Sequence, residues 1–239
     1  MNSMTKLPVN VGSIHFVGIG GIGMSGIAEV LLNLNYQIQG SDLKKSPITE
    51  RLENLGIKIF YKHAVDNLKN ASVVVISSAV KESNPELVAA RNSGLPIVKR
   101  SEMLAELMRL NSNIAIAGTH GKTTTSAMLS HILKSSKIDC TAFFGGISKN
   151  YNSNFLLSHT SNYMIVEADE YDKSFLTLKP DIAVITSIDA DHLDIYKNHK
   201  DFVDAFQEFI FQIKDNGYLI IEESISDYFA NPKNIKCLT

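Results

Sequence analysis

Apolar residues recur along the chain in two alternating patterns, short continuous runs and helical repeats. The segment 13–42 opens with an apolar run at 14–17, passes through glycines into a helical repeat, and returns to an extended run at 36–42. This order predicts a strand, a helix and a second strand. Further runs and repeats follow at 46–56, 57–60, 73–77, 84–94 and 101–110. Strands that alternate with helices predict a parallel sheet covered on both faces.

A second alternation of the same kind starts after residue 110. The polar stretch 109–113 interrupts the pattern, and an apolar run at 114–117, a glycine loop and a helical repeat then follow. We expect a domain boundary there, with domains at 1–110 and 111–239.

Composition narrows the class of protein. The 239 residues are 44% hydrophobic and 20% charged, the net charge is -2 and the pI is near 6.4, so the chain is globular and has no basic surface for nucleic acid or anionic lipid. The sequence shows no signal peptide and no run of 18 apolar residues. Cys140 and Cys237 fit buried thiols in a reducing compartment. These features predict a soluble cytoplasmic protein that binds neither nucleic acid nor membrane.

The first glycine loop has the spacing of a diphosphate-binding turn. Gly18, Gly20 and Gly23 match G-x-G-x-x-G, and Gly21 adds a fourth glycine. Glycine lets backbone N–H groups approach a diphosphate at a helix N-terminus. Asp42 follows at the end of the second predicted strand, where a carboxylate accepts from ribose hydroxyls. On these residues alone, a nicotinamide cofactor, a UDP-sugar and a purely structural turn all stay open.

The second glycine loop, "AIAGTHGKTTTS" at 115–126, departs from the common phosphate-loop spacing, because Ile116 stands where the first glycine would fall. It still follows an apolar strand and precedes a helix. The backbone N–H groups from Thr119 to Thr124 can surround phosphate oxygens, Lys122 can reach the outer phosphates, and the Thr123 hydroxyl can join Mg²⁺. The sequence therefore predicts an ATP site. Its residues are Gly118, Thr119, His120, Gly121, Lys122, Thr123 and Thr124.

Two acidic clusters end the next predicted strands. Glu167 follows one apolar run, and the cluster after the other contains Asp189, Asp191, His192 and Asp194. Ligands bind outside the carboxyl ends of parallel strands, so these groups and the phosphate loop should meet in one crevice. Glu167 and Thr123 offer the oxygen ligands that Mg²⁺ prefers. A lone histidine such as His192 more often orients a metal ligand or caps an element than binds magnesium itself.

Several motifs in this order resemble the Mur ligases of bacterial cell-wall synthesis. They are "HFVGIGGIGMSGIAEVL", "GSD", "AGTHGKTTT", "EADEYDKSFL" and "IDADHLDIY", and the resemblance runs from about residue 14 to 214. It implies an α/β fold, with a Rossmann-like parallel-sheet UDP-binding domain followed by a truncated ATPase-type domain with a phosphate loop. It also implies that the first loop holds UDP, that the shortened second loop is normal, and that His192 matches a metal-site histidine.

The resemblance implies an ATP-dependent amide ligase of peptidoglycan synthesis. ATP would phosphorylate the carboxylate of UDP-N-acetylmuramate, and the amine of L-alanine would attack the acyl phosphate. Lys122, Glu167 and His192 would be catalytic, Thr123, Glu167 and His192 would hold Mg²⁺, and His120 would face the muramyl group. The UDP-sugar would contact Gly18, Gly20, Gly21, Ile22, Gly23, Met24, Ser41, Asp42 and Ser78.

The sequence also departs from the family pattern. Ser187 stands in place of the usual Asn, which would loosen hydrogen bonding near the metal, and Lys62 precedes His63 where glycine is common. Family members are about twice as long, so we expect a missing third domain and an incomplete central sheet. Such a chain would be inactive alone, and its open strand edge would favour a homodimer. The alternatives are a non-catalytic UDP-sugar-binding remnant, a ligase that recycles murein tripeptide, and a nicotinamide-dependent dehydrogenase.

Overall fold

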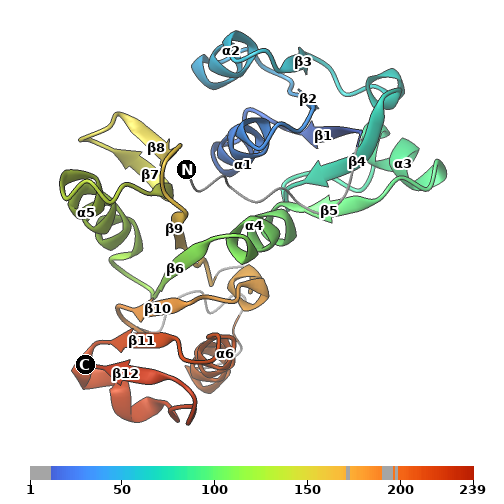
Figure 1. Cartoon of the computed structure of the whole chain (residues 1–239). Helices are drawn as coiled ribbons and strands as arrows, with labels where there is room; N and C mark the ends of the chain where they lie inside the picture. The colour runs from blue at the N-terminus through green and yellow to red at the C-terminus, as the bar shows by residue number, and fades with distance from the viewer. Residues whose placement is uncertain (1–11, 171–172, 190–195, 197–198) are drawn as a thin grey trace. The chain divides into compact units, whose positions relative to one another are not determined.

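The computed structural model describes residues 12–170, 173–189, 196 and 199–239. The chain divides into two compact units (Figure 1). The first is Thr5–Leu104, and the second runs from Ala105 to Thr239. The division falls within helix α4 (Arg100–Arg109). A domain boundary at residue 110 stays a prediction.

The first unit is a five-stranded sheet in the order β3-β2-β1-β4-β5, with every pair of neighbours parallel. Its strands are β1 (Ser13–Val17), β2 (Ile38–Ser41), β3 (Lys58–Phe60), β4 (Ala71–Ile76) and β5 (Ile97–Lys99). Its helices are α1 (Ile22–Asn33), α2 (Pro47–Asn54) and α3 (Pro85–Asn92), with a 3-10 turn η1 (Val65–Leu68). The predicted parallel sheet is confirmed.

The strand order of this unit creates a place for a ligand. The chain moves from β1 through β2 to β3 on one side and then returns to β4 on the other side of β1. A crevice opens outside the carboxyl ends of the strands where the order reverses. Strand β1 is buried along its whole length, which suits its apolar residues Ile14, Phe16 and Val17 and also buries the polar His15.

Helix starts in the first unit follow local capping chemistry. The Ser46 hydroxyl accepts from the N–H of Thr49, and the Thr49 hydroxyl accepts from the N–H of Ser46, which forms a capping box at α2. The Asn84 side chain accepts from the first N–H groups of α3, and Pro85 occupies the first helical position. Both helices begin and end within two residues of the predicted ranges.

The second unit is a seven-stranded sheet in the order β12-β11-β10-β6-β9-β7-β8. Its strands are β6 (Ser112–Ala117), β7 (Thr141–Ser148), β8 (Ser153–Leu156), β9 (Tyr163–Glu167), β10 (Ile182–Ile185), β11 (Tyr218–Ile221) and β12 (Lys236–Leu238). Its helices are α5 (Lys122–Ser135) and α6 (His199–Phe211), with 3-10 turns η2 (Ser174–Thr177) and η3 (Glu223–Tyr228). Neighbouring strands are parallel except for the β7–β8 hairpin.

Two clusters of side chains fill the core of this unit. Helix α5 packs on β6, β7 and β9, over an apolar cluster that includes Ile116, Phe144 and Ile165. Helix α6 packs against η2, where Phe175 lies between Phe206 and Phe209 at ring-centroid distances of 5.3 and 5.2 Å. The β7–β8 hairpin, β11 and α6 were not among the sequence predictions.

The two cysteines differ from the prediction in part. Both are free, and Cys140 is buried as expected. Cys237 is only half-buried, because it lies on the edge strand β12. The expectation of a buried thiol was wrong for this residue.

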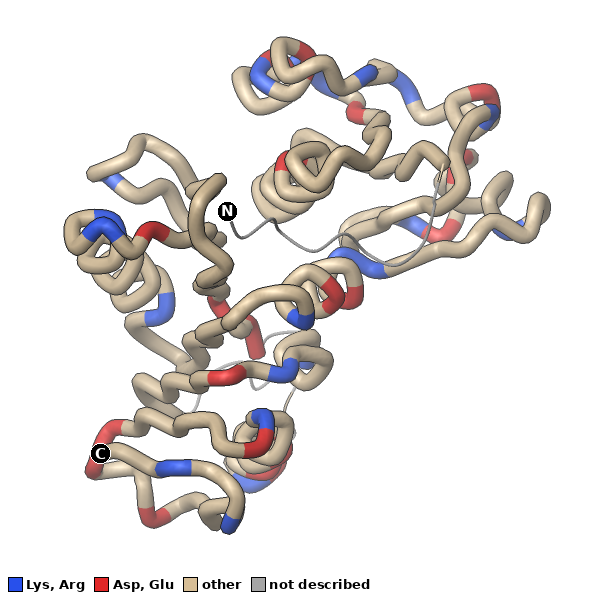
Figure 2. Tube along the Cα trace, in the orientation of Figure 1, with Lys and Arg blue, Asp and Glu red and all other residues tan. Residues whose placement is uncertain are grey.

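Charged residues are distributed over both units. Figure 2 shows acidic and basic residues interspersed along both units. Within the described part of the chain, no helix has the length and apolar character needed to cross a membrane.

Candidate functional site

The phosphate loop joins β6 to α5 and depends on glycine geometry. Gly121 precedes α5 with a left-handed φ of +85°. Gly118 has φ of +131°, and a Cβ there would come within 2.9 Å of the Ser187 backbone nitrogen. The loop thus lies against the end of β10, and only glycine fits at Gly118.

Two of the backbone N–H groups that were predicted to bind phosphate donate instead to a residue just after β10. The Thr119 N–H donates to the Ser187 carbonyl at 3.1 Å, and the His120 N–H donates to the Ser187 hydroxyl at 2.9 Å. The Ser187 hydroxyl also lies 2.8 Å from the Thr119 hydroxyl. The backbone groups at the start of α5 are the ones left to meet an anion, because the first N–H groups of a helix have no partner within it. Ser187 therefore anchors the loop by hydrogen bonds. That serine loosens hydrogen bonding near the metal relative to the usual asparagine stays a prediction.

The ammonium of Lys122 is bound to oxygen atoms of the chain. It donates to the Gly118 carbonyl at 2.6 Å and lies 2.9 Å from both carboxylate oxygens of Glu170. The Glu170 side chain is fully buried, and that of Lys122 is 17% exposed. Sequence analysis quoted Glu170 in its motif but gave it no role; the only signal was a second acid three residues beyond Glu167.

Glu167 and Thr123 come together as the sequence predicted. Glu167 ends β9, and its carboxylate accepts the Thr123 hydroxyl at 3.0 Å and the Gly145 N–H at 2.7 Å. Burial raises the pKa of Glu167, and the two hydrogen bonds oppose that rise. A half-buried carboxylate beside a hydroxyl suits Mg²⁺, because the cation prefers oxygen ligands and its charge compensates a partly desolvated anion. Gly145 on β7 was not among the predicted site residues.

Only part of the remaining predicted metal cluster lies within the described residues. Asp191, His192 and Asp194 lie outside the described residues. His120 is exposed, with its Nε2 atom 3.9 Å from an Asp189 carboxylate oxygen. Among the described residues, no group of three His, Cys, Asp or Glu side chains could hold a metal ion.

In the first unit, the diphosphate-type loop is tied to the end of β2. The N–H groups of Gly18 and Ile19 donate to the Ser41 carbonyl at 2.8 and 2.9 Å, and the Gly20 N–H donates to an Asp42 carboxylate oxygen at 2.9 Å. Asp42 therefore braces the loop in addition to any ribose contact. Of the other predicted contacts, Gly21 is the N-cap residue of α1, and Gly23 lies in the first turn of that helix.

The remaining predicted UDP-sugar contacts differ in exposure. Ile22 is half exposed, and Ser78 is exposed in the turn after β4. The side chain of Met24 is buried in the core, so that residue can offer a ligand only its backbone. Ser41 is also fully buried, and its hydroxyl donates to Glu86 at 2.6 Å.

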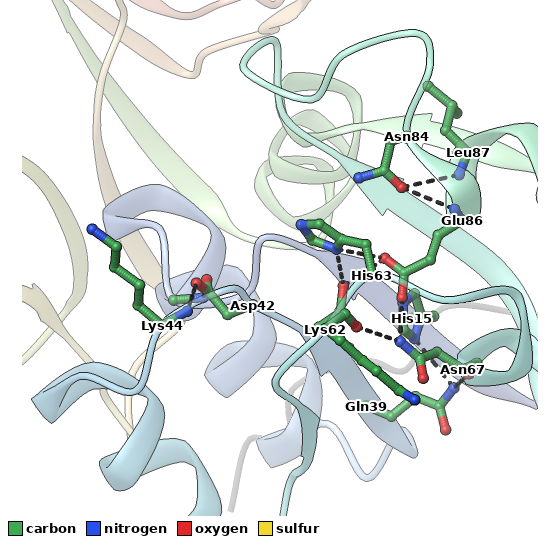
Figure 3. A network of polar contacts seen from close by, with 12 residues as sticks. His15, Gln39, Asp42, Lys44, Lys62, His63, Asn67, Asn84, Glu86 and Leu87 are labelled. Carbon is green, nitrogen blue, oxygen red and sulfur yellow. Dashed lines mark hydrogen bonds and ion pairs between the residues drawn. The ribbon is translucent and has the colours of Figure 1, made fainter.

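Glu86 is the centre of a buried polar network below this loop (Figure 3). One carboxylate oxygen accepts from Ser41 at 2.6 Å and lies 2.9 Å from His63 Nδ1; the other accepts from Asn67 at 2.6 Å and lies 3.3 Å from His15 Nε2. Burial alone would raise the pKa of Glu86, but the contacts with His15, Ser41 and Asn67 lower it to about 2. Sequence analysis missed Glu86, since an acid in the first turn of a helix is usually a solvated dipole partner.

Comparison with protein families decides which class of protein carries these two loops. The family model described as Mur ligase family, catalytic domain, matches residues 13–112, and the model described as Mur ligase middle domain matches residues 116–237. The chain belongs to the Mur ligase family.

Relatives within the Mur ligase family share a name. UDP-N-acetylmuramate--L-alanine ligase of Dinoroseobacter shibae is 56% identical over 220 residues, which are 92% of this chain and 47% of that protein. The protein of the same name from Geobacter sp. is 55% identical over 208 residues, 87% of this chain and 45% of that protein. The chain thus spans about half the length of these relatives.

Solved Mur ligase structures share the fold over nearly the whole chain. UDP-N-acetylmuramate:L-alanyl-gamma-D-glutamyl-meso-diaminopimelate ligase from Neisseria meningitides is 27% identical with a TM-score of 0.83, covering 95% of this chain and 78% of that one. UDP-N-acetylmuramate-alanine ligase from Thermotoga maritima is 30% identical with a TM-score of 0.78, covering 93% of this chain and 53% of that one.

Proposed function

We propose that this chain belongs to an ATP-dependent ligase that joins L-alanine to the carboxylate of UDP-N-acetylmuramate through an acyl phosphate. The observation that carries the proposal is a phosphate loop whose Thr123 hydroxyl lies 3.0 Å from the half-buried carboxylate of Glu167, in a chain 52–56% identical to relatives with that name. The first unit would hold the UDP-sugar, and the second would hold ATP.

The residues of the second unit divide the work of phosphoryl transfer. The N–H groups at the start of α5 would bind phosphate oxygens, and Lys122 would bind the outer phosphates. Thr123 and Glu167, with His192 as the resemblance implies, would hold Mg²⁺, which when bound neutralises phosphate charge. Positioning and charge stabilisation then lower the barrier without a covalent nucleophile on the protein.

A ligase for murein tripeptide is the second candidate. The observation in its favour is the TM-score of 0.83 with the Neisseria meningitides enzyme. That enzyme is 27% identical to this chain, whereas the alanine ligases reach 56%. We therefore favour L-alanine as the incoming amine. A UDP-sugar-binding remnant would not account for the arrangement of Lys122, Thr123 and Glu167 around the phosphate loop.

Activity with defined substrates tests the proposal. In the whole protein, ADP release should require both UDP-N-acetylmuramate and L-alanine. Release that instead requires the tripeptide L-alanyl-γ-D-glutamyl-meso-diaminopimelate would favour the second candidate. Calorimetric titration of this chain provides an independent check on the first unit: UDP should bind more tightly than NAD, and the reverse order would support the dehydrogenase alternative.

Location and assembly follow from the same proposal. ATP and UDP-sugars are cytoplasmic substrates, so we infer a cytoplasmic location. A homodimer through an edge strand of the second unit also stays a prediction. Sedimentation of the purified chain at several concentrations would measure the extent of dimerisation.

A further inference from the structure

The three N–H donors of the Lys122 ammonium are all used within the chain. One contact is with the Gly118 carbonyl at 2.6 Å, and two are with the carboxylate oxygens of Glu170 at 2.9 Å each. A lysine ammonium has three donors and no acceptor. A phosphate oxygen can therefore bind this ammonium only by replacing or sharing one of these contacts.

The position of Glu170 is fixed by its surroundings. Its carbonyl oxygen accepts from the Tyr196 hydroxyl at 2.7 Å and from the Lys173 N–H at 3.1 Å. The Tyr196 side chain is itself 1% exposed, and the Glu170 side chain is fully buried. The carboxylate is thus held beside the phosphate loop by backbone contacts as well as by its ion pair with Lys122.

The energetics of a buried ion pair work against full separation of the two charges. Removing one partner leaves a buried charge uncompensated, which is strongly destabilising in proteins. Lys122 therefore stays tethered to Glu170 while it meets an anion. The carboxylate restricts where the ammonium can lie, and it competes with phosphate oxygens for the same donors.

We propose that Glu170 is a positioning residue for the phosphate-binding lysine. It holds the Lys122 ammonium at the edge of the loop, in place for the outer phosphates of an adenine nucleotide, and by the same contacts it weakens nucleotide binding. This inference rests on the proposed ATP-dependent function. Under it, the position of the Lys122 ammonium is fixed at the expense of nucleotide affinity.

Nucleotide affinity of a neutral isostere is the direct test. Glu170→Gln keeps the shape of the side chain and removes its charge. The variant should bind Mg·ADP and Mg·ATP about tenfold more tightly in calorimetric titration, because roughly one charge-assisted hydrogen bond no longer competes with phosphate. In the whole protein, the same variant should show a lower KM for ATP together with a lower kcat, because the ammonium is less well placed for the transferred phosphoryl group.

Asp181→Asn is the matched control. Asp181 precedes β10 at the end opposite the phosphate loop and pairs with Lys214 at 2.9 Å, so the substitution also neutralises one carboxylate of a lysine ion pair in the same unit. It should leave the nucleotide affinity at the wild-type value. A purely structural role for Glu170 would make the two variants alike, with lower melting temperatures and unchanged or weaker nucleotide binding.

The outcomes separate this inference from the proposed function. A wild-type protein that binds no adenine nucleotide overturns both. A wild-type protein that binds Mg·ADP, with a Glu170→Gln variant of equal or weaker affinity, overturns the positioning role alone. Should the variant not fold, nitrogen-15 NMR of the wild-type lysine ammonium groups decides: a Lys122 signal with slow hydrogen exchange, retained on addition of Mg·ADP, supports the tether. A Lys122 signal with the rapid exchange of a solvated lysine contradicts it.

Discussion

Glu167 and Glu170 lie three residues apart after the same strand, yet their side chains contact different groups of the phosphate site. Glu167 accepts the Thr123 hydroxyl at 3.0 Å, and Glu170 pairs with the Lys122 ammonium at 2.9 Å. The two neighbouring residues at the start of α5 therefore each meet one acid. At the residue scale, this separation supports the proposed metal role of the first carboxylate and the proposed lysine placement by the second.

Loss of the Glu167 carboxylate should affect turnover more than folding. We expect Glu167→Ala in the whole protein to lower kcat by on the order of 10² or more, because the charge stabilisation it provides grows in the transition state. Lys122→Ala and His192→Ala should fall in the same range. Glu106→Ala, which removes an exposed carboxylate from a surface pair with Arg109, is the control and should retain wild-type kcat. Unchanged turnover in Glu167→Ala would remove the proposed metal site.

Acid should weaken the first unit through Glu86. Its pKa falls from an ordinary value of 4.5 to about 2 in the folded protein. A lowered folded-state pKa stabilises the fold above the unfolded-state value, and this contribution is lost as pH falls from about 4.5 towards 2. The full contribution is on the order of 3 kcal/mol by the usual conversion of pKa shifts to free energy.

Urea unfolding of wild type and Glu86→Gln across this pH range measures that contribution. The variant should be less stable at neutral pH, and its free energy of unfolding should depend less on pH between about 4.5 and 2. Glu50→Gln is the control, since Glu50 forms an exposed pair with Lys45 at 3.7 Å. Parallel pH profiles for wild type and Glu86→Gln would contradict the shifted pKa.

At the scale of elements, strand ends bring the site together. β6 leads into the phosphate loop, β9 ends at Glu167, and β7 passes Gly145 beside the Glu167 carboxylate. Ile116 of β6 pairs with Glu167 of β9 in the parallel register, so a shift by one residue would move the acid to the other face. The position of the carboxylate is therefore a property of strand pairing.

A side chain at Gly145 on β7 should force the Glu167 carboxylate to move. A Cβ there would lie 2.7 Å from one Glu167 carboxylate oxygen and 3.5 Å from the Thr123 hydroxyl. Gly145→Ala should displace that carboxylate and weaken binding of Mn²⁺, used as a paramagnetic substitute for Mg²⁺ in the presence of ADP, by about tenfold, the effect of roughly 1.4 kcal/mol. Gly146→Ala is the matched control, because a Cβ there meets only the Thr123 methyl group at an ordinary 3.6 Å. Equal Mn²⁺ affinities for the two variants would contradict the close approach.

At the scale of the whole molecule, the chain has two units with separate sheets, and each is proposed to bind its own ligand. Each unit has its own buried core, and ligands stabilise the part of a protein that binds them. UDP-N-acetylmuramate should therefore slow amide hydrogen exchange mainly in β1, β2 and α1, whereas Mg·ADP should slow it mainly in β6 and α5. Hydrogen exchange followed by mass spectrometry would report both patterns. Protection of the first unit by Mg·ADP would contradict the assignment of ligands to units.

Much of this architecture could be predicted from the sequence because its signals are local. The glycine loops lie at strand-to-helix junctions as predicted, and the apolar runs at 14–17 and 114–117 lie in central strands. The β7–β8 hairpin was missed because its strand "TAFFGGIS" contains adjacent glycines, which weaken a strand pattern. Helix α6 was missed although its phenylalanines recur at helical spacing.

The sequence by itself determined the family, the alternation of strands and helices up to the phosphate loop, and the residue types that can bind phosphate and metal, because these depend on short motifs and on hydrophobic periodicity. Only the tertiary structure decided what each polar side chain contacts. Glu170 meets Lys122 from 48 positions away, Ser41 meets Glu86 from 45, and Ser187 meets the N–H of His120 from 67. Such pairings follow from sheet register and burial, which bring together residues whose separation along the chain carries no signal of contact.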